Sequence, residues 1–227
     1  AAYLVPNVTP LYDGPSGLAY YPGTGLPDRY DDHFFLCDFR GASGTSRINS
    51  FAVKPKGATF ELVDLKPFME RICATDCDFG PDSAMYVADW IDGWGRPMAG
   101  RIYKVVAPSK ANDPRVRETQ ALIAEGMAGR STPELARLLG HSDMRIRQEA
   151  QFALAAIGSE AIAPFAAAAQ AGSTLVARLH GIWGLGQVAR KSPDALNGVV
   201  PLLADQELEV RCQAATVIGD GRTPAAY

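Results

Sequence analysis

Histidine is scarce in this sequence: the 227 residues include only His33, His141 and His180, which lie far apart along the chain. Three scattered histidines do not predict a metal site, because zinc ligands usually recur at short, regular spacings. We expect His33, at the start of a strand, to be a surface or edge residue rather than a catalytic base. We expect His180 to be a hydrogen-bonded histidine within a helix interface.

Cysteine is also sparse, with four residues in the chain. Only Cys73 and Cys77 lie close together, and their C-x3-C spacing differs from the C-x2-C spacing of common zinc and redox sites. Alternation along a strand would place both on one face, which leaves a bridge or a metal pair open. We expect instead that each cysteine replaces a small apolar residue.

Basic tracts and long apolar runs are absent as well. The net charge of −3 and the lack of a Lys/Arg-rich tract argue against nucleic acid as a partner. No run approaches the roughly 18 apolar residues of a membrane span, so no transmembrane segment is expected. The first residues, AAYLVPNVTP, lack the basic start and apolar centre of a secretion signal. Either the protein is cytoplasmic or its start is missing.

The sequence changes character near residue 107. Before it, short runs rich in aromatic and β-branched residues predict seven strands: GLAYY, HFFLCDF, RINSFAVK, ATFELVD, CATDCDF, AMYVADW and RIYKVV. After it, Ala, Leu, Arg and Gln recur with apolar residues at helical spacing. We therefore predict a strand domain over 1–107, a linker over 108–112 and a helical domain over 113–227.

The strand half contains an internal repeat. HFFLCDF and AMYVADW both combine an apolar run with Asp and an aromatic residue, and Asp38 aligns with Asp89. The first unit has four strands and the second has three, a pattern typical of consecutive β-propeller blades. We predict an all-β region formed by the last two blades of a propeller, with the missing blades in an absent N-terminal part.

The helical half also repeats. Arg147, Arg178 and Arg211 align at spacings of 31 and 33 residues, and small residues follow each of them. A two-helix repeat of this length predicts an all-α solenoid that resembles HEAT repeats. The first helix of each repeat is expected in TPELARLLG, EAIAPFAAAAQ and PDALNGVVPLLAD, the last of these over 193–205. We expect the three arginines to cap the preceding turn or to pair with its Asp and Glu residues, such as Asp143 and Glu207.

Several motifs together resemble a known family. DGPSGLAYYPGTGLPDRYDDHFFLCDFRG, ATDCDFGPDSAMYVADWIDGW, GRIYKV, EAQFALAAIG and ARLHGIWGLGQVAR are similar to the large bacterial membrane-bound-dehydrogenase-like proteins. In that family a propeller similar to soluble glucose/sorbosone dehydrogenases precedes HEAT repeats and a C-terminal c-type cytochrome domain. The resemblance implies a secreted, periplasmic or membrane-associated protein that oxidises a sugar or related alcohol and passes electrons to haem.

The resemblance also implies cofactors. On this resemblance, calcium and pyrroloquinoline quinone would belong to the full-length protein, and haem c to a missing C-terminal domain, because this chain has no C-x-x-C-H motif. Quinone-dependent sugar dehydrogenases hold the quinone partly through arginines, but Cys73 and Thr75 occupy the matching places here. Arg40 is the residue that the resemblance carries over as a basic group for cofactor or substrate.

Four acidic residues are the candidate metal ligands. Alternation sends Asp76 and Asp78 to one face of their strand, and Asp38 and Asp89 end two other strands. We predict an acidic rim that binds calcium or sugar hydroxyls. A structural role for Asp76, holding backbone amides, stays open. Trp90 could stack on a sugar ring or pack between blades.

Two functions follow from these observations. The first is a fragment of a sugar/alcohol dehydrogenase-like protein, with the helical repeats as a scaffold toward an electron-accepting cytochrome domain. The second is a non-catalytic binding or assembly module for a protein or glycan partner. The sequence leaves open whether the full-length protein is an enzyme, and this chain alone is predicted to be inactive.

Overall fold

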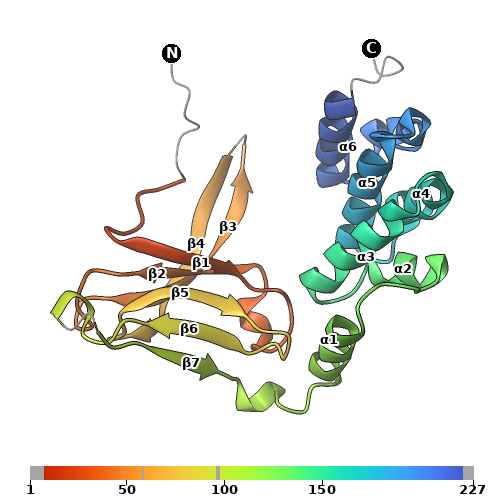
Figure 1. The fold of residues 1–227 in the computed structure, drawn as a ribbon. Helices are drawn as coiled ribbons and strands as arrows, with labels where there is room; N and C mark the ends of the chain where they lie inside the picture. The colour runs from red at the N-terminus through yellow and green to blue at the C-terminus, as the bar shows by residue number, and fades with distance from the viewer. Residues whose placement is uncertain (1–7, 58, 96–97, 222–227) are drawn as a thin grey trace. The chain divides into compact units, whose positions relative to one another are not determined.

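The computed structural model describes residues 8–57, 59–95 and 98–221. The chain divides into two compact units, residues 1–120 and 121–227 (Figure 1). The described strands all lie in the first unit. The division falls within helix α1 (Pro114–Glu125), C-terminal to the predicted linker 108–112.

The first sheet is antiparallel, with the strand order β1-β2-β3-β4. Its strands are β1 (Pro15–Tyr20), β2 (His33–Asp38), β3 (Arg47–Lys56) and β4 (Thr59–Glu70). Strand β2 is buried along most of its length. The reason is that Phe34 stacks on Phe51 on one face of the sheet, while Phe35 packs into the core on the other.

The second sheet is also antiparallel, with the order β5-β6-β7. Its strands are β5 (Ala74–Phe79), β6 (Met85–Asp89) and β7 (Arg101–Val105). In β5, Cys77 and Phe79 are buried while Asp76 and Asp78 are exposed. This is the period-two alternation that the sequence predicts.

One apolar core joins the two sheets. Gly17 of β1 approaches β5 so closely that a Cβ atom there would lie 2.6 Å from the Cα atom of Asp76. The Ser16 hydroxyl donates to the carbonyl oxygen of Ala74 at 3.2 Å. The shared core includes Phe35, Cys37, Ile48, Cys77, Phe79, Met85 and Val87. This packing brings the residues that follow β2 next to those that follow β6.

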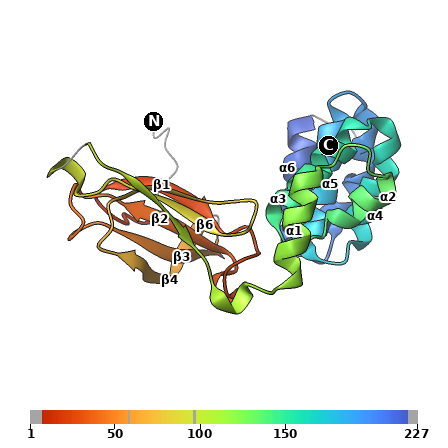
Figure 2. The same cartoon turned by 60° about the horizontal axis from the view of Figure 1, so that its bottom comes forward.

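The remaining α-helices are α2 (Thr132–Leu138), α3 (Met144–Ala156), α4 (Ile162–Ala171), α5 (Leu175–Ala189) and α6 (Leu208–Gly221). Helix α5 lies between α4 and α6 in both views (Figures 1 and 2). A Cβ atom at Gly184 would lie 2.1 Å from the Phe165 ring, so glycine permits the close approach of α4. Within the part of the chain that the structure describes, none of the helices combines the length and apolarity that a membrane crossing needs.

The aligned arginines hold the turns of the helical unit. Arg147 donates to the carbonyl oxygens of His141 and Ser142 at 2.8 and 2.9 Å. Arg211 donates in the same way to the carbonyl oxygens of two residues before α6, at 2.7 and 3.0 Å. Arg178 forms an ion pair with Asp205 at 2.5 Å. Arg147 and Arg211 thus satisfy carbonyl groups in the turn before their own helices, as expected. Arg178 differs, because its partner Asp205 lies in the turn before α6.

The predicted fold class, two propeller blades followed by a HEAT-like solenoid, is wrong. The described residues form two small antiparallel sheets and a set of helices, an α/β mix. A repeated strand pattern shows only that two segments have similar local sequences, and it does not fix how their sheets are arranged. Here the two sheets pack directly on each other around one core. The segment expected as the first helix of the last repeat forms two 3₁₀ helices, η5 (Pro193–Gly198) and η6 (Val200–Ala204). Pro201 and Gly198 explain this, because both disfavour a continuous α-helix.

Candidate functional site

The ends of β2 and β6 meet at one place in the first unit. Asp38 and Asp89 are the last residues of these strands. The next residues, Phe39 and Trp90, stack with ring centroids 5.7 Å apart and an interplanar angle of 14°. Trp94 packs edge-on against Phe39 at 5.8 Å. The aligned Asp-aromatic pairs of the sequence therefore form one aromatic cluster flanked by two carboxylates.

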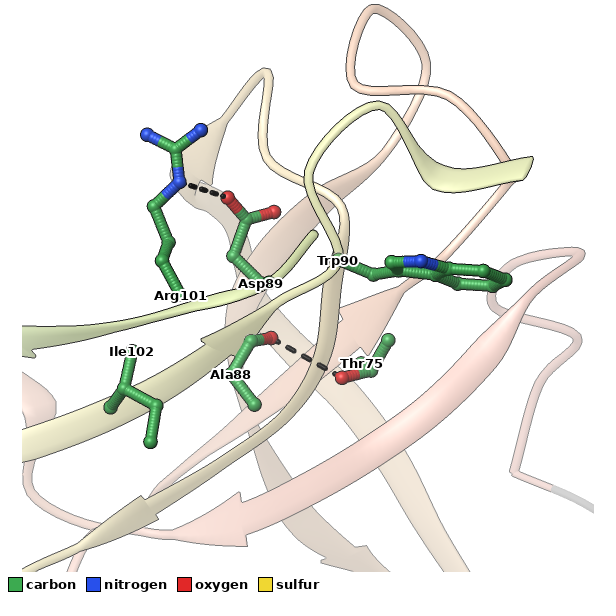
Figure 3. Close-up of a pocket in the computed structure, with 7 residues that line it drawn as sticks. Thr75, Ala88, Asp89, Trp90, Arg101 and Ile102 are labelled. Carbon is green, nitrogen blue, oxygen red and sulfur yellow. Dashed lines mark hydrogen bonds and ion pairs between the residues drawn. The ribbon is translucent and has the colours of Figure 1, made fainter. Parts of the chain in front are cut away.

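A shallow hollow of about 340 Å³ opens beside Trp90 (Figure 3). Its lining residues are Thr75, Ala88, Asp89, Trp90, Gly100, Arg101 and Ile102. In Figure 3 the side chains of Ala88 and Ile102 point to one side of the β6–β7 strands, and the Asp89–Arg101 ion pair lies on the opposite side. The hollow is therefore lined by an aliphatic side chain, the Trp90 indole and the Thr75 hydroxyl, with the ion pair at its edge.

The pairing register of β6 and β7 sets the position of the Asp89–Arg101 ion pair. Asp89 and Arg101 are cross-strand partners at the end of the β6–β7 ladder. The Nε atom of Arg101 lies 3.3 Å from Oδ2 of Asp89, whose side chain is 7% exposed. The Arg101 side chain is 47% exposed. Because only Nε engages Asp89, the terminal guanidinium nitrogens are left as hydrogen-bond donors toward solvent.

A β-bulge places Thr75 in the hollow. The β5–β6 register shifts between Ala74 and Asp76, so Thr75 has no direct cross-strand partner. Bulges of this kind redirect a side chain relative to the regular alternation. The Thr75 hydroxyl donates to the carbonyl oxygen of Ala88 at 3.3 Å. Its lone pairs remain available to accept a hydrogen bond from a ligand.

Arg40 belongs to a second ion pair outside the hollow. Its Nε atom lies 2.8 Å from Oδ2 of Asp38, whose side chain is fully buried. The backbone amide of Gly14 donates to the same carboxylate at 3.2 Å. A second carboxylate, from Asp13, lies 3.5 Å from Arg40. The Arg40 guanidinium is therefore paired with two local carboxylates. Phe39, the residue before Arg40 in the chain, stacks on Trp90.

The acidic residues of β5 also lie outside the hollow. Asp76 accepts a hydrogen bond from the amide of Cys77 at 2.9 Å, and Asp78 accepts one from the amide of Phe79 at 2.8 Å. This is the amide-holding role left open for Asp76. Both side chains share the exposed face of the strand.

The four predicted calcium ligands do not assemble. In residues 8–57, 59–95 and 98–221, no group of three or more His, Cys, Asp or Glu side chains could hold a metal ion. Asp38 and Asp89 are each neutralised by an arginine instead. Calcium at Asp38, Asp76, Asp78 and Asp89 stays a prediction that this geometry does not support.

The cysteines are free thiols. The near pair is Cys37 with Cys77, not the Cys73 and Cys77 that share the C-x3-C motif. A hydrogen bond to Cys77, together with burial, raises the pKa of the Cys37 thiol. All three of these residues are buried in unit 1 and act as small apolar residues, as expected. For Cys212 the expectation is wrong, because this residue is exposed.

The prediction for His33 is wrong, because its side chain is buried. Its Nδ1 atom lies 2.9 Å from the carbonyl oxygen of Asp31 and its Nε2 atom lies 3.1 Å from Asp64. The prediction for His180 is confirmed. It is buried in the helix interface and lies 2.7 Å from Gln151.

Sequence reasoning named Asp89 and Trp90 but missed Arg101 and Ile102 as site residues. Their signal was available: GRIYKV begins with a cation and alternates polar with apolar residues. The sequence did not reveal the strand register, which places Arg101 opposite Asp89. Comparisons with family models, curated proteins and solved structures found no match to this chain. A function must therefore be argued from the hollow itself.

Proposed function

We propose that this protein binds a carbohydrate in the hollow beside Trp90. The observation that carries the proposal is the grouping of Trp90, the Asp89–Arg101 pair and Thr75 around one open cavity. Ligand sites combine apolar walls with a few convergent polar groups that set orientation. Both functions considered from the sequence, sugar oxidation and glycan binding, share this ligand class.

The chemistry of a sugar ring complements these residues. One face of a pyranose exposes C–H groups, which pack favourably on an indole or an aliphatic side chain such as Ile102. The ring edge carries hydroxyl groups that both donate and accept hydrogen bonds. The Thr75 hydroxyl accepts from such a hydroxyl, and the exposed Arg101 guanidinium, held in place by Asp89, donates to its neighbour at the edge of the hollow. The charged donor makes the Arg101 hydrogen bond stronger than a neutral one.

The size and openness of the hollow favour one unit of a longer glycan. Its volume of about 340 Å³ is at the lower end for small-molecule sites. The exposed Arg101 and Ile102 form its outer side. A sugar unit held there leaves its glycosidic neighbours in solvent, which suits a binding module.

Oxidation of the bound sugar remains a prediction. It would need the quinone, calcium and haem-bearing acceptor that the family resemblance implies. Arg40, the residue carried over for the cofactor, contacts Asp38 and Asp13. No described contact favours oxidation over binding. A redox dye assay with added quinone, calcium and a panel of aldoses tests it directly.

The test of carbohydrate binding uses the full chain and isothermal titration calorimetry against a panel of mono- and oligosaccharides. We expect saturable binding to at least one sugar, weakened about tenfold or more by Arg101→Gln or Asp89→Asn. Lys104→Gln is the matched control, because Lys104 is also a β7 cation paired with an aspartate but does not line the hollow. Circular dichroism checks that each variant is folded.

A second readout reports on Trp90 alone. The chain contains three tryptophans, so Trp94→Phe with Trp183→Phe leaves Trp90 as the sole indole emitter. The sugar that binds by calorimetry should change the emission of this variant with the same midpoint. The proposal fails if no sugar binds, or if binding is equally strong in Arg101→Gln and Lys104→Gln.

A further inference from the structure

A second cavity lies in the helical unit, apart from the hollow described above. It has a volume of about 440 Å³ and is bounded by side chains of α3, α5 and α6, with Arg190 at the C-terminal end of α5. The lining residues that matter here are Gln151, Trp183, Gln187, Arg190, Val217 and Asp220. Its size is in the range of small-molecule sites.

The cavity contains a buried acceptor without a donor. Oε1 of Gln187 is inaccessible to solvent and has no hydrogen-bond partner among the described residues. Buried polar atoms in native proteins are nearly always hydrogen-bonded, so an orphaned one calls for an explanation. A ligand N–H group in the cavity would satisfy Gln187 once its amide turns toward the cavity that the residue lines.

His180 fixes the orientation of a second amide. The Nε atom of Arg147, which can only donate, lies 3.3 Å from His180 Nε2. The His180 proton therefore resides on Nδ1, which lies 2.7 Å from Gln151 Oε1 and donates to it. Because the oxygen of Gln151 faces His180, its amide nitrogen is left as a donor for the cavity that Gln151 lines.

Two opposite charges line the same cavity without meeting. Across residues 8–57, 59–95 and 98–221, neither Arg190 nor Asp220 forms an ion pair with the other or with any third residue. Both side chains are accessible. A cation and an anion that flank one cavity without pairing are complementary to a ligand that carries both charges.

We infer that this cavity binds a free α-amino acid with an apolar side chain. The ligand carboxylate pairs with Arg190 and accepts from the Gln151 amide, and guanidinium is the side chain best suited to carboxylate. The ligand ammonium pairs with Asp220 and donates to Gln187 Oε1. The ligand side chain packs on Val217 and the Trp183 ring, both half-buried.

The experiment compares leucine with two analogues that each lack one charge, 4-methylpentanoate and isoamylamine. Calorimetry on the full chain should show leucine binding, with each analogue weaker by about tenfold or more. Arg190→Gln should remove the advantage of leucine over isoamylamine, and Asp220→Asn should remove its advantage over 4-methylpentanoate. Arg137→Gln and Asp194→Asn are matched controls, because both residues are exposed and do not line the cavity.

Three results would overturn the inference. The first is no leucine binding at about 10 mM, which is far above the concentrations expected for a specific site. The others are equal affinity for leucine and both analogues, or an equal loss of leucine affinity in the control variants. Gln187→Met adds a test that keeps both charges, and leucine affinity should fall there too. These residues lie in the second unit, so this result and that of the sugar experiment are independent.

Discussion

Phe39 and Trp90 stack nearly parallel across the junction of two different sheets, with ring centroids 5.7 Å apart. Each ring directly follows the terminal aspartate of its strand. The stack therefore joins the two arginine–aspartate pairs, Arg40 with Asp38 and Arg101 with Asp89, into one structural unit.

This stack should be measurable as a coupling energy. In a double-mutant cycle with Phe39→Leu and Trp90→Leu, we expect an interaction of about 0.5–1.5 kcal/mol beyond the loss of buried area. The measurement is urea unfolding followed by circular dichroism. Additive single effects would show that the rings are neighbours without an energetic link.

Removing Arg40 should expose the cost of a buried charge. Among the described residues, Arg40→Met leaves the buried Asp38 carboxylate with the Gly14 amide as a hydrogen-bond donor. We expect a loss of about 2–3 kcal/mol, at or below the range for fully buried pairs, because a third of the Arg40 side chain is exposed.

The control for that variant removes the charge as well. Arg40→Met combined with Asp38→Asn should recover part of the lost stability, since no uncompensated charge remains. Arg29→Met, at an exposed position, should have little effect. No recovery in the double variant would assign the loss to packing of the arginine stem.

Tyr21 should contribute both a hydrogen-bond pair and a dependence on high pH. Its hydroxyl donates to the Leu26 carbonyl at 2.8 Å and accepts from the Leu26 amide at 3.0 Å. Burial raises the pKa of Tyr21 to about 12. Tyr21→Phe leaves both Leu26 groups unpaired, with an expected cost of about 1–3 kcal/mol.

The sign of the high-pH effect follows from linkage. Because the folded pKa is above the unfolded value, the unfolded state loses its proton first. The contribution of Tyr21 to the free energy of unfolding is fully present below pH 10, and it falls as the pH rises from 10 toward about 12. Tyr21→Phe should flatten this part of the curve; an unchanged slope would assign it to other groups.

His180 should weaken the helical unit in acid. Burial, with a smaller effect from Arg147, lowers the pKa of His180 to about 4. The unfolded state then binds a proton that the folded state excludes. Stability should be independent of this group above pH 6.5 and fall toward pH 4, by at most about 1.4 kcal/mol per pH unit.

The measurement is the difference in urea midpoint between the original chain and His180→Gln at several pH values. The subtraction removes the carboxylates that titrate over the same range. We expect the difference between the two chains to shrink as the pH falls. Arg137→Gln, at an exposed position of the same unit, should keep the slope of the original chain; the same change of slope in both variants would contradict the assignment.

Local structure followed closely from local sequence. The seven runs rich in aromatic and β-branched residues coincide with strands β1 to β7. Alternation alone predicted that Cys77 and Phe79 point inward while Asp76 and Asp78 point outward. Arg147 and Arg211 were correctly expected to hold the turns before their helices, because their carbonyl partners lie five or six residues away in the chain. The Arg178 partner Asp205 lies 27 residues away and could not be read from local sequence.

Only the tertiary structure decided how these elements combine. Repeated strand patterns could not say that two sheets share one core. The apolar spacing over 193–205 predicted a helix, but Pro201 and Gly198 divide this segment into two 3₁₀ helices. The hollow depends on the Asp89–Arg101 register and on the bulge at Thr75. Such pairings bring together residues that are distant in the chain, and their energies depend on neighbours that local pattern does not specify.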